Sequence, residues 1–208
     1  MAQYTLFTNP MSRGQIARWA LHEVGADYEQ VLVDWADKPA AFLAANPMGK
    51  VPTVIHHSET GDRVITECAA ICAYLGEVEP EGKLLPSDAE LADYYRWMFF
   101  AAGPVEQAIV GRSMGWEVPK EREAMVGFGS LERVLDALDN HFADHDFVCG
   151  PRFTMADVYV GSQIDWGLNF GSIPPRESFV AYAERIQARP AYKAAKAIDN
   201  QLIQESRK

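Results

Sequence analysis

Three short stretches of the sequence carry residues that suit the binding of a charged ligand. Ser12 follows a run of β-forming residues, Tyr4–Thr8, and precedes a helical pattern. Residues 46–52 read N-P-M-G-K-V-P, and Glu67 and Cys68 stand where a strand pattern gives way to a second helical pattern. Free N–H groups at a helix start attract negative charge, and a serine hydroxyl there can donate a hydrogen bond. The plainer alternative is that Ser12 and the Thr-Glu pair only cap their helices.

The first eighty residues predict the elements that position these stretches. β-forming residues alternate with segments whose apolar residues recur every three or four positions. The expected strands are 4–8, 28–33, 51–55 and 63–65, and the expected helices are 12–25, 39–45 and 68–75. A turn-prone segment, 58–62, makes the last two strands a hairpin. The predicted order is therefore β-α-β-α-β-β-α.

The remainder of the sequence predicts helices only. A polar segment with proline and glycine, residues 80–87, is the expected linker between a first domain at 1–79 and a second at 88–208. Apolar residues keep to one face over 131–142 and again over 192–202, whereas 154–169 is apolar nearly all round and should lie at the centre of its domain. We expect an α/β domain followed by an all-helical one.

Composition and charge exclude several classes of protein. The chain has 208 residues and a formal net charge of −10, which argues against general binding to nucleic acid because a phosphate backbone repels an acidic surface. No segment resembles a signal peptide or a membrane-spanning helix. Three cysteines, an odd and sparse number, fit a reducing compartment, so we expect a cytoplasmic protein.

The order of three motifs resembles that of a known family. N-P-M-G-K-V-P at 46–52, T-E-C-A-A-I-C-A-Y-L at 66–75 and F-T-M-A-D at 153–157 resemble the cytosolic glutathione transferases, in a bacterial-looking, serine-type (theta/zeta-like) form. The resemblance covers essentially the whole chain. It implies a thioredoxin-like first domain that binds glutathione as co-substrate, a helical-bundle second domain, no metal and a homodimer.

The resemblance also implies roles for individual residues. Ser12 corresponds to the residue that donates a hydrogen bond to the glutathione sulfur and favours the thiolate. A cis bond between Val51 and Pro52 turns the backbone of Val51 toward an extended peptide. Lys50 corresponds to a partner of the glycine carboxylate of glutathione.

Glu67 and Cys68 correspond to the pair that holds the γ-glutamyl group of glutathione. Cys68 departs from the usual serine, and a thiol donates a weaker hydrogen bond than a hydroxyl. Cys68 and Cys72 lie one turn apart, which favours core packing over a redox or metal role.

The second domain is expected to hold a small apolar electrophile. Its pocket is assigned to Arg13 from the first domain and to Tyr95, Met98 and Trp116. Others of the aromatic residues in 94–100 and at 166 and 170 are expected in a dimer interface, because the resembled family is usually dimeric. Aromatic residues at helical spacing are also common in a core. The T-x-x-D pattern at 154–157 is assigned to helix capping and stability.

Two alternatives to a conjugating transferase differ from it in function. A dithiol reductase needs a cysteine in the turn after the first strand, and none precedes Cys68. A ligand-binding or scaffold protein that lacks conjugating activity stays open. Among enzymes, conjugation, isomerisation, dehalogenation and peroxide reduction all begin with the same thiolate and stay open as well.

Overall fold

The strand β1 (Tyr4–Thr8) is an inner strand of a four-stranded mixed sheet in the computed structural model, which describes residues 2–79 and 84–206. The strand order is β2-β1-β3-β4; β2 (Tyr28–Leu32) runs parallel to β1, and β3 (Thr53–Ser58) runs antiparallel to it. The strand β4 (Gly61–Thr66) completes the predicted hairpin with β3. Every residue of β1 is buried, because helices cover both faces of the sheet.

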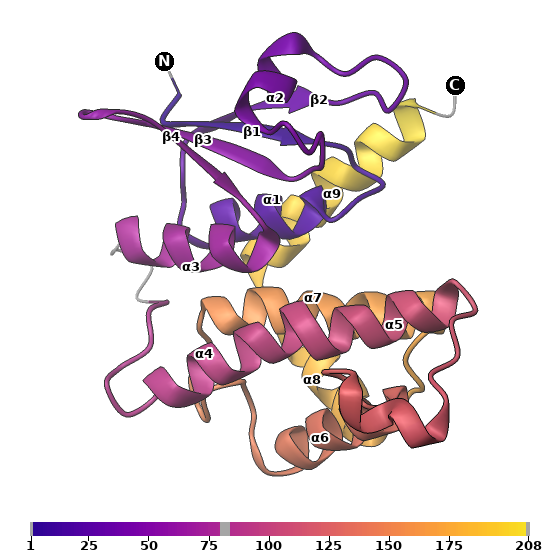
Figure 1. Cartoon of the computed structure of the whole chain (residues 1–208). Coiled ribbons are helices and arrows are strands. Elements are labelled where there is room, and N and C mark those ends of the chain that lie inside the picture. The colour runs from indigo at the N-terminus through magenta and orange to yellow at the C-terminus, as the bar shows by residue number, and fades with distance from the viewer. Residues whose placement is uncertain (1, 80–83, 207–208) are drawn as a thin grey trace. The chain divides into compact units, whose positions relative to one another are not determined.

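The helices of this sheet domain lie on both faces of it (Figure 1). The helices α1 (Gly14–Glu23) and α3 (Cys68–Val78) pack on one face, and the short α2 (Ala40–Ala45) lies on the other. Phe42 of α2 contacts Phe7 of β1, with ring centroids 5.5 Å apart. The predicted order β-α-β-α-β-β-α is confirmed.

The described residues form two compact units. One combines those of 1–85 with those of 188–208, and the other is 86–187. The C-terminal helix α9 (Pro190–Glu205) therefore belongs with the sheet, whereas the sequence placed it in a helical domain at 88–208. The apolar face of α9 predicted a packed helix, but such a face does not specify its partner. Residues 80–83 of the predicted linker lie outside the described residues.

The second unit is helical, as predicted. Its helices are α4 (Leu91–Phe100), α5 (Glu106–Ser113), α6 (Leu131–Asp144), α7 (Met155–Phe170) and α8 (Glu177–Gln187). A π-helical segment that contains Pro104 joins α4 to α5. Most of α7 is buried, which confirms its predicted central place. Among the described residues, none of the helices is long and apolar enough to cross a membrane.

Asp157 fixes the start of α7. One of its carboxylate oxygens accepts hydrogen bonds from the N–H and hydroxyl of Thr154, at 2.8 and 3.1 Å. The other accepts from the N–H of Val148 at 2.7 Å and from the hydroxyl of Tyr182 at 3.0 Å. The side chain is fully buried, and burial raises its pKa to about 6. The predicted capping box is confirmed, and the same carboxylate also ties α7 to α8.

We predict that Asp157→Ala lowers the free energy of unfolding by about 3 kcal/mol, because it leaves the buried N–H of Val148 without its partner. Urea unfolding at pH 7 measures this change. Asp144→Ala, an exposed acid at the end of α6, is the control and should change stability by less than about 0.5 kcal/mol. Equal effects of the two substitutions would contradict the assignment.

Candidate functional site

Strand register brings the three sequence stretches to the same end of the neighbouring strands β1, β3 and β4, and this end forms one edge of the sheet. Phe7, next to the end of β1, pairs with Thr53 at the start of β3. Thr53 in turn pairs with Thr66 at the end of β4. Because β3 runs opposite to both neighbours, the turn after β1, the loop before β3 and the start of α3 all meet at this edge. Ser12, Val51 and Glu67 belong to these three segments.

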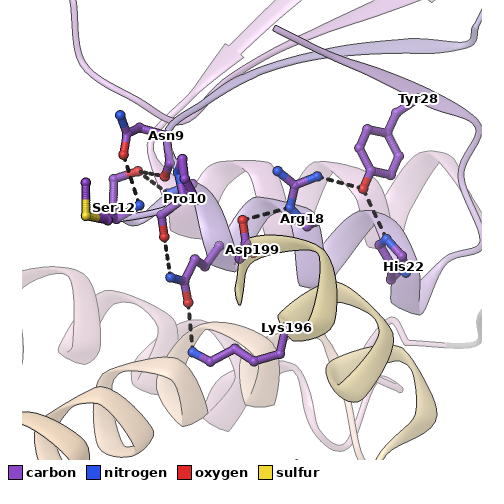
Figure 2. A network of polar contacts seen from close by, with 11 residues as sticks. Asn9, Pro10, Ser12, Arg18, His22, Tyr28, Lys196 and Asp199 are labelled. Carbon is purple, nitrogen blue, oxygen red and sulfur yellow. Dashed lines mark hydrogen bonds and ion pairs between the residues drawn. The ribbon is translucent and has the colours of Figure 1, made fainter. Parts of the chain in front are cut away.

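The turn that carries Ser12 is held by side-chain hydrogen bonds (Figure 2). The Ser12 hydroxyl donates to the carbonyl of Asn9 at 2.6 Å and accepts from the N–H of Gly14 at 3.0 Å. The Asn9 side chain donates to the carbonyl of Val33 at 3.0 Å and accepts from the N–H of Met11 at 2.9 Å. Ser12 thus does contribute to the helix start, and Asn9 anchors the turn beyond the end of β2.

Gly14 permits the close approach of α1 to the end of β1. A Cβ atom at this position would lie 2.0 Å from Oγ1 of Thr8 and 3.1 Å from Oγ of Ser12. Thr8 is fully buried, so its hydroxyl is not accessible to a ligand. Tyr4 is also fully buried, and its hydroxyl donates to Glu79 at 2.6 Å. Burial also raises the pKa of the Tyr4 hydroxyl. Because Thr8 and Tyr4 are both buried, Ser12 carries the accessible hydroxyl of this segment.

Asn46 organises the loop of residues 46–52. Its amide nitrogen donates to the carbonyl of Lys50 at 2.9 Å and to the hydroxyl of Thr53 at 3.0 Å, and its oxygen accepts from the N–H of Met48 at 3.1 Å. The side chain is 6% exposed, so these bonds satisfy a buried amide. The bond between Val51 and Pro52 is cis, as expected. Asn46 was part of the motif, but the sequence did not assign it this role.

Two lysines belong to this part of the site. The side chain of Lys50 is exposed and has no ion pair with a described residue. Lys38, in the segment between β2 and α2, is half-buried and donates to the carbonyl of Gly49 at 3.1 Å. Sequence reasoning missed Lys38, because a lone lysine in an irregular segment has no pattern that predicts its contacts.

Glu67 has a strained backbone at the start of α3. Its φ is 63° and its ψ 120°, and among the described residues it is the only non-glycine residue with a positive φ. Such a conformation costs roughly 1–3 kcal/mol and is concentrated at functional sites. The exposed Glu67 carboxylate makes no hydrogen bond or ion pair with any described residue, so side-chain capping does not account for it.

Cys68 faces inward from the start of α3. Its thiol lies 3.7 Å from the carbonyl of Arg13, and the residue is 8% exposed. This contact joins α3 to the turn of Ser12. Cys72 is fully buried, and burial raises the pKa of its thiol well above the ordinary value. The predicted packing role of the two cysteines fits their burial, and both are free thiols.

The residues assigned to the electrophile pocket differ in exposure. Arg13, in the first unit, is half-buried. In the second unit Met98 is 3% exposed, whereas Tyr95 and Trp116 are 49% and 67% exposed. Trp116 and Phe128 line a cavity of about 280 Å³. The role of these residues stays a prediction. Within the described ranges, no group of three or more His, Cys, Asp or Glu side chains could hold a metal ion.

Comparisons with known proteins agree with this geometry. Residues 2–77 match the family model of the glutathione S-transferase N-terminal domain, and residues 88–166 match a model of the C-terminal domain. Glutathione S-transferase 1 of Schizosaccharomyces pombe is 30% identical to the chain, over 96% of this chain and 100% of the relative.

Two solved structures share the fold over nearly the whole chain. A sphingomonad glutathione S-transferase complexed with glutathione is 30% identical, with a TM-score of 0.75 over 94% of this chain and 98% of the other. A glutathione transferase of Methylococcus capsulatus is 28% identical, with a TM-score of 0.77 over 95% and 99% of the two chains. The predicted thioredoxin-like and all-helical domains are confirmed, and the chain belongs to the glutathione S-transferase family.

Proposed function

We propose that this family member is a serine-type glutathione transferase in which Ser12 stabilises the thiolate of glutathione for attack on a small apolar electrophile. The observation that carries the proposal is the shared edge of the sheet, where an accessible hydroxyl, an unpaired backbone segment and an unpaired carboxylate come from three adjacent segments.

The groups at this edge complement the charges of glutathione. Among the described residues, the backbone N–H and C=O of Val51 have no hydrogen-bond partner, so they can pair with an extended peptide. The Glu67 carboxylate suits the γ-glutamyl amine, and Lys50 and Lys38 suit the glycine carboxylate. Cys68 contributes its backbone at the start of α3, since its thiol faces Arg13.

Ser12 can supply the hydrogen bond that a thiolate needs. Its hydroxyl donates to the carbonyl of Asn9, and rotation about the Cβ–Oγ bond redirects the hydrogen to a sulfur outside the turn. The start of α1 adds the positive end of a helix dipole. Both effects favour the thiolate over the thiol, and the thiolate is the nucleophile.

The electrophile and the assembly belong to the same proposal. We assign the pocket for the electrophile to Arg13, Tyr95, Met98 and Trp116. We also propose that the protein is cytoplasmic. Leu91, Tyr95 and Phe99 form an exposed apolar stripe along α4, with exposed fractions of 43%, 49% and 70%. A stripe of this kind supports a homodimer. Tyr95 is therefore a candidate both for the electrophile pocket and for the dimer interface.

A second candidate function has one observation in its favour. The Ser12 hydroxyl already has two backbone partners, Asn9 and Gly14, as a purely structural serine would. A protein that binds glutathione without forming a thiolate would use Ser12 only to hold the turn. Substitution of Ser12 separates the two functions.

We predict that Ser12→Ala lowers kcat for conjugation of glutathione to a chlorodinitrobenzene about tenfold to hundredfold, because a hydrogen bond to a charged group is worth about 1.5–3 kcal/mol. The Kd for glutathione, measured by calorimetry, should change less than about threefold. Ser206→Ala, an exposed serine at the end of α9, is the control. Unchanged turnover in Ser12→Ala would remove the catalytic role from this residue and leave Arg13 to be tested.

We predict that Glu67→Ala and Glu67→Gly both weaken glutathione binding about tenfold or more, because each removes the carboxylate assigned to the γ-glutamyl amine. The two variants should differ in stability, with Glu67→Gly more stable by about 1 kcal/mol, since glycine adopts a positive φ without strain. Calorimetric titration and thermal unfolding measure the two effects. Unaltered affinity in both variants would show that Glu67 is not a glutathione ligand.

A further inference from the structure

The helix α9 contacts the Ser12 turn through one glutamine (Figure 2). The ammonium of Lys196 donates to Oε1 of Gln15 at 2.8 Å, and Nε2 of Gln15 donates to the carbonyl of Pro10 at 2.5 Å. Pro10 is buried and lies between Asn9, whose carbonyl accepts from Ser12, and Ser12 itself. A chain of hydrogen bonds therefore runs from Lys196 to the turn.

We propose that Lys196 is a positioning residue for Ser12, which rests on the function proposed above. The ammonium of lysine has three donors and no acceptor, so it can only face the oxygen of the Gln15 amide. This fixes the amide nitrogen toward the carbonyl of Pro10. Without Lys196 only the hydrogen bond to Pro10 holds the amide, and any rotation that turns its oxygen toward this carbonyl, which is also an acceptor, breaks that bond.

The position of Lys196 is set by a buried ion pair on the same two helices. Asp199, three residues further along α9, accepts from Nε of Arg18 of α1 at 3.0 Å, and both side chains are 1% exposed. Arg18 also donates to the hydroxyl of Tyr28 at 3.0 Å. Trp19 and Tyr192 add an edge-to-face contact at 5.1 Å.

Because of these contacts, the packing of α9 on α1 does not depend on Lys196. Since Arg18 and Asp199 hold α9 on α1 without Lys196, removal of the ammonium should leave the fold in place and free only the Gln15 amide. Lys193, on the same helix, is exposed and has no ion pair with a described residue. It provides a matched control with the same change of charge.

The test measures kcat and KM for glutathione in four variants. We predict that Lys196→Met lowers kcat about threefold to tenfold, as expected for one hydrogen bond, with KM within about twofold. Lys196→Arg should restore most of the activity because it keeps a donor at this place. Lys193→Met should behave as the wild type. Gln15→Glu keeps the contact with Lys196 but loses the donor to Pro10, so it should reproduce the loss even if Lys196→Met folds poorly.

A double substitution distinguishes this inference from the proposed function. If Lys196 acts through Ser12, Lys196→Met should cause no further loss in the Ser12→Ala background. Three outcomes would overturn the inference. The kcat of Lys196→Met could equal that of the wild type, or Lys193→Met could lose as much kcat as Lys196→Met. Lys196→Met could also lower kcat in the Ser12→Ala background as much as it does in the wild type. A normal kcat in Ser12→Ala alone would instead refute the proposed function.

Discussion

The antiparallel pairing of β3 with both β1 and β4 is the constraint on which the site depends. It pairs Thr53 with Phe7 on one side and with Thr66 on the other. Side chains alternate between the faces of a strand, so a shift of β1 by one residue would move Phe7 from the face where it contacts Phe42 of α2 to the opposite face. Burial of both faces of β1 therefore fixes the register, and the register places Ser12, Val51 and Glu67 at one edge.

The carboxylate at this edge differs in its hydrogen bonding from a buried carboxylate elsewhere in the molecule. In the second unit the buried carboxylate of Asp157 accepts four hydrogen bonds, which tie the start of α7 to Val148 and to Tyr182 of α8. At the edge of the sheet, the carboxylate of Glu67 is exposed and unpaired with described residues, on a strained backbone. Fully satisfied groups stabilise a fold, whereas strained and unpaired ones must be compensated elsewhere, which is typical of a ligand site.

Local patterns predicted much of this structure. The alternation of strand and helix patterns predicted the first domain in its correct order. The motif around Val51 and Pro52 carried the family resemblance that implied the cis bond. Spacing on the long helices predicted the buried residues of α6 and the central place of α7. These features depend on residues close in sequence, which is why a single sequence reveals them.

Contacts between distant segments could not be predicted in this way. The packing of α9 on α1, the hydrogen bond from Lys38 to Gly49 and the contact of Lys196 with Gln15 join positions whose residue types are common on any helix or loop. Cys68 illustrates the same point, since the contact of its thiol with the carbonyl of Arg13 joins two segments that are far apart in the sequence.

The ionisation of bound glutathione decides whether Ser12 activates the thiol. Thiolate absorbance in the ultraviolet, followed against pH for glutathione on the wild-type protein, gives the pKa of the bound thiol. We expect a pKa well below that of glutathione in solution, because Ser12 and the start of α1 stabilise the thiolate. Bound glutathione with an unshifted thiol pKa would contradict the catalytic role of Ser12 and favour a binding protein.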